Sequence, residues 1–254
     1  MGIVNATPDS FADGGRYRPL DQALRLCDEG ADMIDIGGES TRPGAAEVAV
    51  DEEFARVVPV VAGLRAARPS VTISVDTRRA RVAALAIDAG ASVINDVSAG
   101  ADPAMFPLCA DRACAMVLMH MRGTPATMRS LVDYDDVCVD VWRALQARAE
   151  AARAAGVKTL WLDPGIGFAK TASQSLALLR DLPSRRDLPV LVGASRKSFL
   201  AGHGPQATPE ERLPGSLAVA LWCRDAGVDV LRVHDVAATR GALATWGALQ
   251  GETS

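Results

Sequence analysis

Short apolar runs and longer amphipathic segments alternate along the whole chain. The runs are rich in Val, Ile and Leu and show little polar alternation, which is typical of parallel strands covered on both faces. They predict eight strands, at 2–6, 33–36, 71–76, 93–96, 115–120, 160–163, 189–194 and 230–234. Apolar residues at three- and four-residue spacing between the runs indicate helices. The helices are predicted at 20–29, 52–66, 79–89, 135–155, 213–225 and 237–249, with shorter ones at 103–110 and 175–182.

One unit recurs in this alternation: a helix, then a glycine, then a strand that ends in a polar residue. Gly30, Gly90, Gly156 and Gly227 each stand where a left-handed residue is expected just past a helix. Eight strand–helix units in about 250 residues predict a single (β/α)8 TIM barrel that spans residues 1–254. An open doubly wound sheet is the alternative. It would have a Gly-rich turn after its first strand, and residues 5–10 read NATPDS instead.

Composition narrows the function classes. The chain is 49% hydrophobic and 23% charged, with a net charge of −4, which excludes a disordered chain and a general nucleic-acid-binding surface. No apolar run approaches the ~18 residues that a membrane span needs. The first residues lack the basic and apolar regions of a signal peptide, so we expect a cytoplasmic protein. The five cysteines form no Cys-x-x-Cys pair, so we expect reduced thiols.

The predicted strand ends carry the candidate chemistry, because the site of such a barrel lies at the carboxyl ends of its strands. Carboxylate, amide and ammonium groups there suit the edge of a flat nitrogen heterocycle; the residues are Asp76, Asn95, Asp163 and Lys197. A basic cluster of Arg42, Arg232 and His234 suits phosphate or pyrophosphate. Asn5 offers a carbonyl oxygen to a hard cation that the substrate's phosphates would also bind.

Several features leave alternatives open. Asp35 and Asp96 suit ligands as well as they suit helix caps or loop anchors, and His120 suits a structural and a site role equally. The segment 165–171 resembles a phosphate loop but lacks the glycine before its lysine, so we discount it. Two long loops, 7–19 and 37–51, are candidate lids over the site.

The strand-end motifs resemble those of the dihydropteroate synthase family, which acts in folate synthesis. The matching stretches follow the family's order and cover essentially the whole chain. They are MGIVNATPDSF at 1–11, DGG at 13–15, DIGGESTRPG at 35–44, SVDT at 74–77, INDVS at 94–98, MHMRG at 119–123, LDPGIGF at 162–168, GASRKS at 193–198 and RVHDV at 232–236.

The resemblance implies a reaction in which dihydropterin pyrophosphate condenses with 4-aminobenzoate in the presence of Mg²⁺, giving dihydropteroate and pyrophosphate. It implies pterin ligands at Asp76, Asn95, Asp163 and Lys197, pyrophosphate ligands at Thr41, Arg42, Arg232 and His234, and a metal ligand at Asn5. It implies an aminobenzoate wall of Pro43, Phe168, Ser195 and Lys197, and loop residues Phe11 and Asp13 that close over the reacting carbon. Catalytic roles fall to Asp13, Arg42, Asp163 and Lys197.

The resemblance also implies a homodimer and a sulfonamide target. The first loop shows no insertion at 11–15, so we expect ordinary sulfonamide sensitivity. Relatives usually carry a few residues before the first strand, whereas Met1 here lies on it. Two rivals share the pterin ligands: a methyltetrahydrofolate–corrinoid methyltransferase and a silent pterin-binding homologue. Neither needs the SRKS run at 195–198 together with Arg232 and His234.

Overall fold

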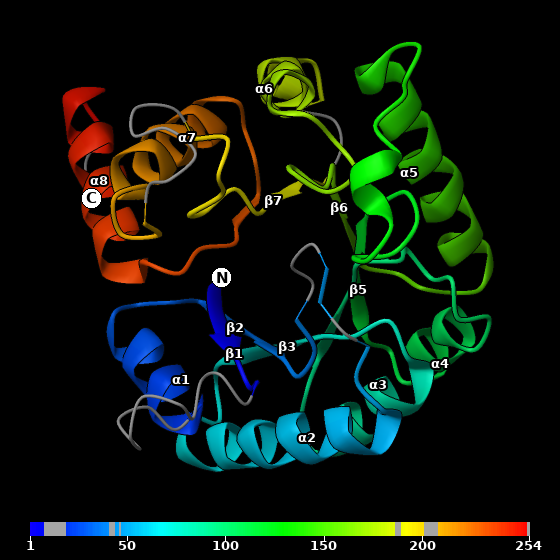
Figure 1. Ribbon diagram of the computed structural model, residues 1–254. Coiled ribbons are helices and arrows are strands. Elements are labelled where there is room, and N and C mark those ends of the chain that lie inside the picture. Colours follow the sequence, from blue (N-terminus) through cyan, green and yellow to red (C-terminus); the bar gives the residue numbers. More distant parts are fainter. Residues whose placement is uncertain (8–18, 41–43, 46, 186–188, 201–207, 253–254) are drawn as a thin grey trace.

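Parallel strands form the inside of this molecule and helices form its outside, as the computed structural model in Figure 1 shows. The structure describes residues 1–7, 19–40, 44–45, 47–185, 189–200 and 208–252. The strands in these ranges are β1 (Gly2–Asn5), β2 (Met33–Gly37), β3 (Thr72–Asp76), β4 (Val93–Asp96), β5 (Ala115–Met119), β6 (Leu160–Asp163), β7 (Leu191–Val192) and β8 (Val230–Leu231). The helices are α1 (Pro19–Asp28), α2 (Val50–Ala67), α3 (Ala80–Asp88), α4 (Met105–Asp111), α5 (Val137–Ala154), α6 (Ala172–Asp181), α7 (Leu213–Asp225) and α8 (Val236–Leu249).

Backbone pairing closes the strands into a barrel. Strands β1 to β6 form one parallel sheet in chain order, and β7 pairs with β8. Two isolated parallel bridges, Gly2–Val233 and Leu162–Val190, connect these sheets at both seams. The Ile3 amide donates to the Val233 carbonyl at 3.0 Å, and the Leu162 amide donates to the Pro189 carbonyl at 2.8 Å. The fold is therefore the predicted TIM barrel.

The predicted strands and helices are all present in the described residues, with small shifts at their ends. The last two strands are shorter than predicted, because each keeps only two residues in regular pairing. Two short 3₁₀ helices, η2 (Met128–Ser130) and η3 (Leu182–Arg185), were not predicted. The four glycines at helix ends have positive φ angles of 83–117°, the left-handed conformation expected there.

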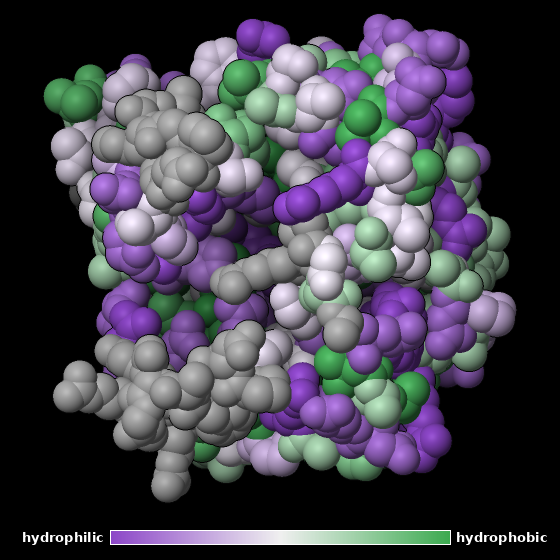
Figure 2. Space-filling view, in the orientation of Figure 1, coloured by the Kyte–Doolittle hydropathy of each residue, from purple (hydrophilic) through white to green (hydrophobic). Residues whose placement is uncertain are grey.

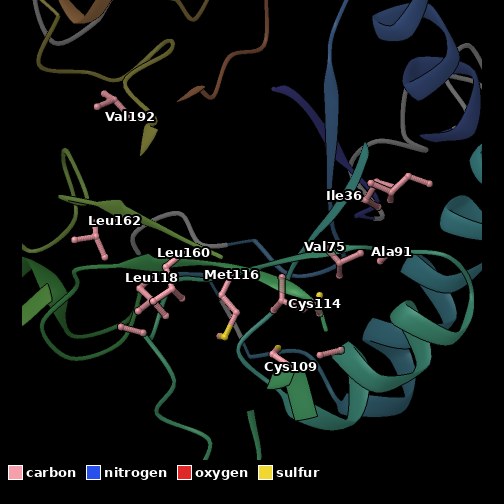
Figure 3. Packing of buried hydrophobic residues seen from close by; sticks show 14 of the residues in the cluster. Ile36, Val75, Ala91, Cys109, Cys114, Met116, Leu118, Leu160, Leu162 and Val192 are labelled. Carbon is pink, nitrogen blue, oxygen red and sulfur yellow. The ribbon is translucent and has the colours of Figure 1, made fainter. Parts of the chain in front are cut away.

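A large apolar core fills the space between the strands and the helices. In Figure 3 the labelled residues Met116, Leu118, Leu160 and Leu162 belong to this outer core, on β5 and β6. All five cysteines are free in the structure. No helix within the described ranges is long and apolar enough to cross a membrane.

A second, smaller apolar cluster fills the inside of the barrel, and polar groups lie next to it. Its buried members are Met1, Val93, Val117 and Leu191, and the partly buried residues packed against it include Met33 and Trp161. Side chains two residues apart on a strand share one face. Asp35, Asn95 and Asp163 therefore follow Met33, Val93 and Trp161 on the inward face, nearer the carboxyl ends of their strands. This alternation places a polar layer directly on an apolar one.

We expect Gly90→Ala to destabilise the fold by about 1–3 kcal/mol. Gly90 follows α3 with φ +117°, and a Cβ there would lie 2.9 Å from Cγ of Arg65, whose guanidinium donates to the Gly90 carbonyl at 2.8 Å. Gly241→Ala is the matched control, because a Cβ at Gly241 in α8 meets nothing within 4 Å. The control should stabilise by about 0.5–1 kcal/mol. Urea unfolding measures both, and equal effects would contradict this account.

Candidate active site

A buried ion cluster occupies the inside of the barrel near the carboxyl ends of the strands. Asp35 on β2 is completely buried. Its carboxylate accepts hydrogen bonds from Ser74 Oγ at 2.6 Å and from Arg232 Nε at 2.6 Å. Nη2 of Arg232 also contacts Asp76 Oδ2 at 2.9 Å. One guanidinium therefore joins two carboxylates that are far apart in the sequence.

The ionised form of Asp76 is disfavoured by its burial. Burial raises its pKa to about 7; the charge of Arg232 lowers the pKa and opposes this shift, whereas the charge of Asp35 raises it. Desolvation disfavours the charged form, and a single guanidinium shared by two carboxylates offsets only part of that cost. Asp76 therefore changes charge near neutral pH, which suits a group that meets a ligand.

The carboxamide of Asn95 is oriented by the same cluster. Parallel pairing of β3 with β4 places Asn95 beside Asp76, and its Nδ2 donates to Asp35 Oδ2 at 3.1 Å. Asp35 accepts and does not donate when ionised, so this bond assigns the nitrogen to the Asp35 side. The carboxamide oxygen consequently points away from Asp35, as an acceptor.

A second set of charged groups lies across the barrel, on β6 and after β7. Asp163 is buried, its pKa is raised by that burial, and its Oδ1 accepts from the Gly165 amide at 2.7 Å. Lys197 lies with Nζ 4.0 Å from the centre of the Phe168 ring and donates to the Ile166 carbonyl. Burial lowers the pKa of Lys197 to about 7, although the Asp163 charge raises it.

The two sets face one common space. Gly193, at the end of β7, lies between them: a Cβ built on it would be 3.7 Å from Cδ of Arg232 and 3.9 Å from Oδ2 of Asp163. The missing side chain leaves this space open. Figure 2 shows hydrophilic residues gathered around a recess near the middle of this face. Acidic, amide and cationic groups thus lie close together around Gly193 and Arg232.

His234 and Ser195 stand next to this hollow, at the last seam of the barrel. Nδ1 of His234 lies 3.2 Å from Ser195 Oγ, which also accepts from the His234 amide at 3.2 Å. The neighbouring Arg196 instead bonds Asp235 through two nitrogens, at 2.9 and 2.6 Å. Of the cationic residues in the SRKS run, Arg196 is used for structure and Lys197 faces the hollow.

Asn5 is exposed at the carboxyl end of β1. Within the described ranges no group of three His, Cys, Asp or Glu side chains could hold a metal ion. A single carboxamide oxygen fits Mg²⁺ only where substrate oxygens and water complete the coordination, which is how this ion is usually held. The predicted residues Phe11, Asp13, Thr41, Arg42 and Pro43 lie outside the described residues.

The open alternatives have clear structural outcomes. Asp96 is a loop anchor, since it accepts from the amides of Ser98 and Gly100, both at 2.8 Å. Asp35 is neither a cap nor a loop anchor but the centre of the buried cluster. His120 is buried against Lys170, with its Nδ1 3.1 Å from Nζ. Sequence analysis missed Lys170, because it discounted the segment as a phosphate loop and had no other signal for a buried lysine.

The contacts of Arg232 in the structure differ from those that the sequence predicted. We assigned it to the pyrophosphate, in a pair with His234. In the structure its Nε and Nη2 bond Asp35 and Asp76, which belong to the predicted pterin side. Much of its charge is therefore balanced within the protein, and positive charge for an anion has to come largely from other groups.

Comparison with known proteins gives consistent results. The family model for pterin-binding enzymes matches residues 1–234. The dihydropteroate synthase of Synechocystis is 44% identical over 247 residues, which cover 94% of this chain and 85% of that protein.

Solved structures agree over the whole fold. A Xanthomonas albilineans dihydropteroate synthase with 4-aminobenzoic acid superposes with a TM-score of 0.91 at 44% identity, covering 100% of this chain and 93% of the other. The enzyme from the same organism in complex with 7,8-dihydropteroate gives a TM-score of 0.88 at 42% identity, with coverage of 100% and 94%.

Asp35→Asn should lower the free energy of unfolding by about 3 kcal/mol, because it removes one partner of a buried ion pair. It should also lower the pKa of Asp76, since a repelling carboxylate is lost. Ser74→Ala, which removes one hydrogen bond to the same carboxylate, is the control and should cost about 1 kcal/mol. Urea unfolding at pH 7 compares them. An Asp35→Asn protein as stable as the wild type would show that the cluster does not support the fold.

Proposed function

Since this chain belongs to the dihydropteroate synthase family of pterin-binding enzymes, we propose that it is a transferase that joins dihydropterin pyrophosphate to 4-aminobenzoate, giving 7,8-dihydropteroate and pyrophosphate. One observation carries the proposal: Asp76, Asn95, Asp163 and Lys197 lie close together around Arg232, at the carboxyl ends of the strands. The related enzyme in complex with 7,8-dihydropteroate, which is 42% identical to this chain, supports the assignment of this product.

The pterin ring would bind to the acceptors and donors of this hollow. The oxygens of Asp76, Asn95 and Asp163 accept from ring N–H and exocyclic amine groups, and the Lys197 ammonium donates to a ring acceptor. A ligand that uses these groups replaces the water they lose on burial, whereas a ligand without matching donors leaves charged groups unpaired. This penalty gives selectivity for the heterocycle.

The pyrophosphate would leave on the side of His234 and Ser195, with Thr41 and Arg42 contributing from the long loop and Arg232 from the pterin side. Asn5 would hold Mg²⁺ through its carboxamide oxygen. When bound, Mg²⁺ would supply charge neutralisation for the departing pyrophosphate. The protein's own cations act in the same direction, because they favour the state in which negative charge has collected on the leaving oxygen.

We infer a dissociative substitution. The bond between the pterin methylene carbon and the pyrophosphate oxygen breaks, the oxygen keeps the electron pair, and the pterin methylene becomes a cation. The carboxylates of Asp163 and, from the first loop, Asp13 favour this cation. The amine nitrogen of 4-aminobenzoate, placed by Phe168, Ser195, Lys197 and Pro43 with Phe11, then bonds the carbon and releases one proton to water. No side chain acts as a nucleophile.

Further expectations accompany this function without being needed for it. We expect a homodimer, for which Trp222 on α7 and Leu249 at the end of α8, 75% exposed, offer apolar surface. We also expect a cytoplasmic location and, with no insertion at 11–15, sulfonamide inhibition at ordinary concentrations.

The test is product formation from dihydropterin pyrophosphate, Mg²⁺ and radiolabelled 4-aminobenzoate. We expect labelled dihydropteroate from the wild type, and a loss of about 100-fold or more in kcat/KM for Lys197→Met, because the variant lacks a cation inside the site. Lys158→Met is the control; Lys158 is exposed before β6 and its replacement should change nothing.

The other outcomes decide between the rival functions. Methyl transfer from methyltetrahydrofolate to a corrinoid, without dihydropteroate, would support the methyltransferase. Tight pterin binding with neither product would support a silent homologue. A pterin covalently attached to the protein would contradict the absence of a nucleophile.

Pterin affinity should pass through a maximum near neutral pH. The raised pKa of Asp76, about 7, makes this group neutral and unable to accept two N–H bonds at lower pH. The lowered pKa of Lys197, about 7, removes the ammonium donor at higher pH. Calorimetric titration with a pterin across pH 5–9, corrected for the ligand's own ionisation, measures this. The Asp76→Asn variant should bind pterin weakly, and its affinity should no longer fall as the pH is lowered below neutrality. A wild-type profile flat on both sides would contradict the assigned roles.

A further inference from the structure

Lys170 is a buried lysine to which the reaction described above assigns no role. It follows β6 in the segment that leads to α6, and only 8% of its surface is exposed. Its Nζ lies 2.9 Å from the Phe168 carbonyl, 3.1 Å from the Gly165 carbonyl and 3.3 Å from the His120 carbonyl. Nδ1 of His120 completes the set at 3.1 Å. Four acceptors for three N–H bonds describe a site built for an ammonium group.

The imidazole of His120 acts here as an acceptor. Burial, together with the charges of Lys170 and Arg122, lowers the pKa of His120 to about 3, so the ring is neutral. An ammonium group has donors only, which leaves Nδ1 as the acceptor and the proton on Nε2. Tyr134 packs beside this ring and donates its hydroxyl to the Ala169 carbonyl at 2.9 Å. Lys170 therefore contacts the neutral His120 ring as well as three backbone carbonyls.

These bonds connect two loops at the mouth of the barrel. The His120 carbonyl belongs to the loop after β5, while the Gly165 and Phe168 carbonyls belong to the turn after β6. The close approach is tight: Gly165 has φ +65°, and a Cβ on it would lie 2.0 Å from the His120 oxygen. Lys170 therefore fastens the 164–168 turn to the neighbouring strand end.

The fastened turn touches the site directly. The Ile166 carbonyl of this turn accepts a hydrogen bond from Lys197 Nζ. The Phe168 ring of the turn contacts the same Nζ through its face. Close packing continues at Gly167, where a Cβ would be 3.1 Å from Cδ of Lys197. The Lys197 charge lowers the pKa of Lys170, the Asp163 charge raises the pKa of both lysines, and the Arg232 charge lowers that of Lys197.

We propose that Lys170 is a positioning residue of the condensation: by holding the 164–168 turn it sets the place of Phe168 and the place and charge of Lys197. The proposal rests on the proposed synthase function. It predicts effects on 4-aminobenzoate binding and on the titration of Lys197, which a residue that only supports the fold would not produce. The charged and titratable groups that face Lys170 are His120, Arg122, Asp163 and Lys197, with Tyr134 behind His120.

The experiment compares Lys170→Met, which keeps the length of the side chain without its charge, with the conservative Lys170→Arg and the surface control Lys158→Met. In Lys170→Met we expect KM for 4-aminobenzoate to rise about tenfold, because the wall formed by Phe168 and Lys197 loses its support. Burial lowers the pKa of Lys170 itself to about 7, so its charge is only partly present where Lys197 titrates. Losing it should still move the basic limb of pterin binding upward, by no more than about half a pH unit. Lys170→Arg should restore most of the lost affinity, and Lys158→Met should match the wild type.

Thermal unfolding measured alongside separates the alternatives. A lower Tm and a proportional fall in kcat, with unchanged KM and an unchanged basic limb, would overturn the proposal and leave Lys170 a structural residue. If the wild type binds pterin but makes no dihydropteroate, the proposed function fails, and the shift of the basic limb alone decides the role of Lys170. If the wild type neither binds pterin nor forms product, both proposals are overturned.

Discussion

The guanidinium of Arg232, shared between Asp35 and Asp76, is the interaction on which the site depends. Two carboxylates that face the inside of a barrel repel each other and lose their hydration, so without a cation both could not remain charged. One guanidinium for two carboxylates leaves an excess of negative charge, and burial raises the pKa of Asp76 toward neutrality. The Asp35 carboxylate, which Arg232 also contacts, orients the carboxamide of Asn95. Polar groups used for ligand binding are thus held in place by polar groups that the ligand need not touch.

The barrel supports this cluster through the alternation of its strands. Met33 and Asp35 face the same interior, as do Val93 and Asn95, so an apolar layer lies beneath a polar one. Close packing below excludes water and fixes the side chains above. The seam between β1 and β8 matters equally, because it brings Arg232, near the end of the chain, beside Asp35 on β2. The fold builds the site by closing a ring and not through one local motif.

The opposite side of the hollow has the reverse imbalance of charge. Lys170 is buried and Lys197 is half-buried near Asp163, and desolvation lowers the pKa of each lysine to about 7. Carboxylates outnumber the guanidinium on one side, and ammonium groups outnumber the carboxylate on the other. Such a separation of charge suits a polar heterocycle with donors on one edge and acceptors on the other. Without a bound ligand, the same separation of charge lowers the stability of the folded protein.

The sequence determined the order of strands and helices, because apolar runs, helical spacing and the glycines after four of the helices are local signals. It also determined which strand ends carry ionisable groups, and the family resemblance supplied their roles. The tertiary structure decided how those groups pair. That Arg232 bonds Asp35 and Asp76, or that Lys170 reaches His120, depends on barrel closure and on side-chain packing between segments up to 197 residues apart. Pairing over such separations leaves no periodic trace in the chain, since it arises only when distant strand ends meet around one axis.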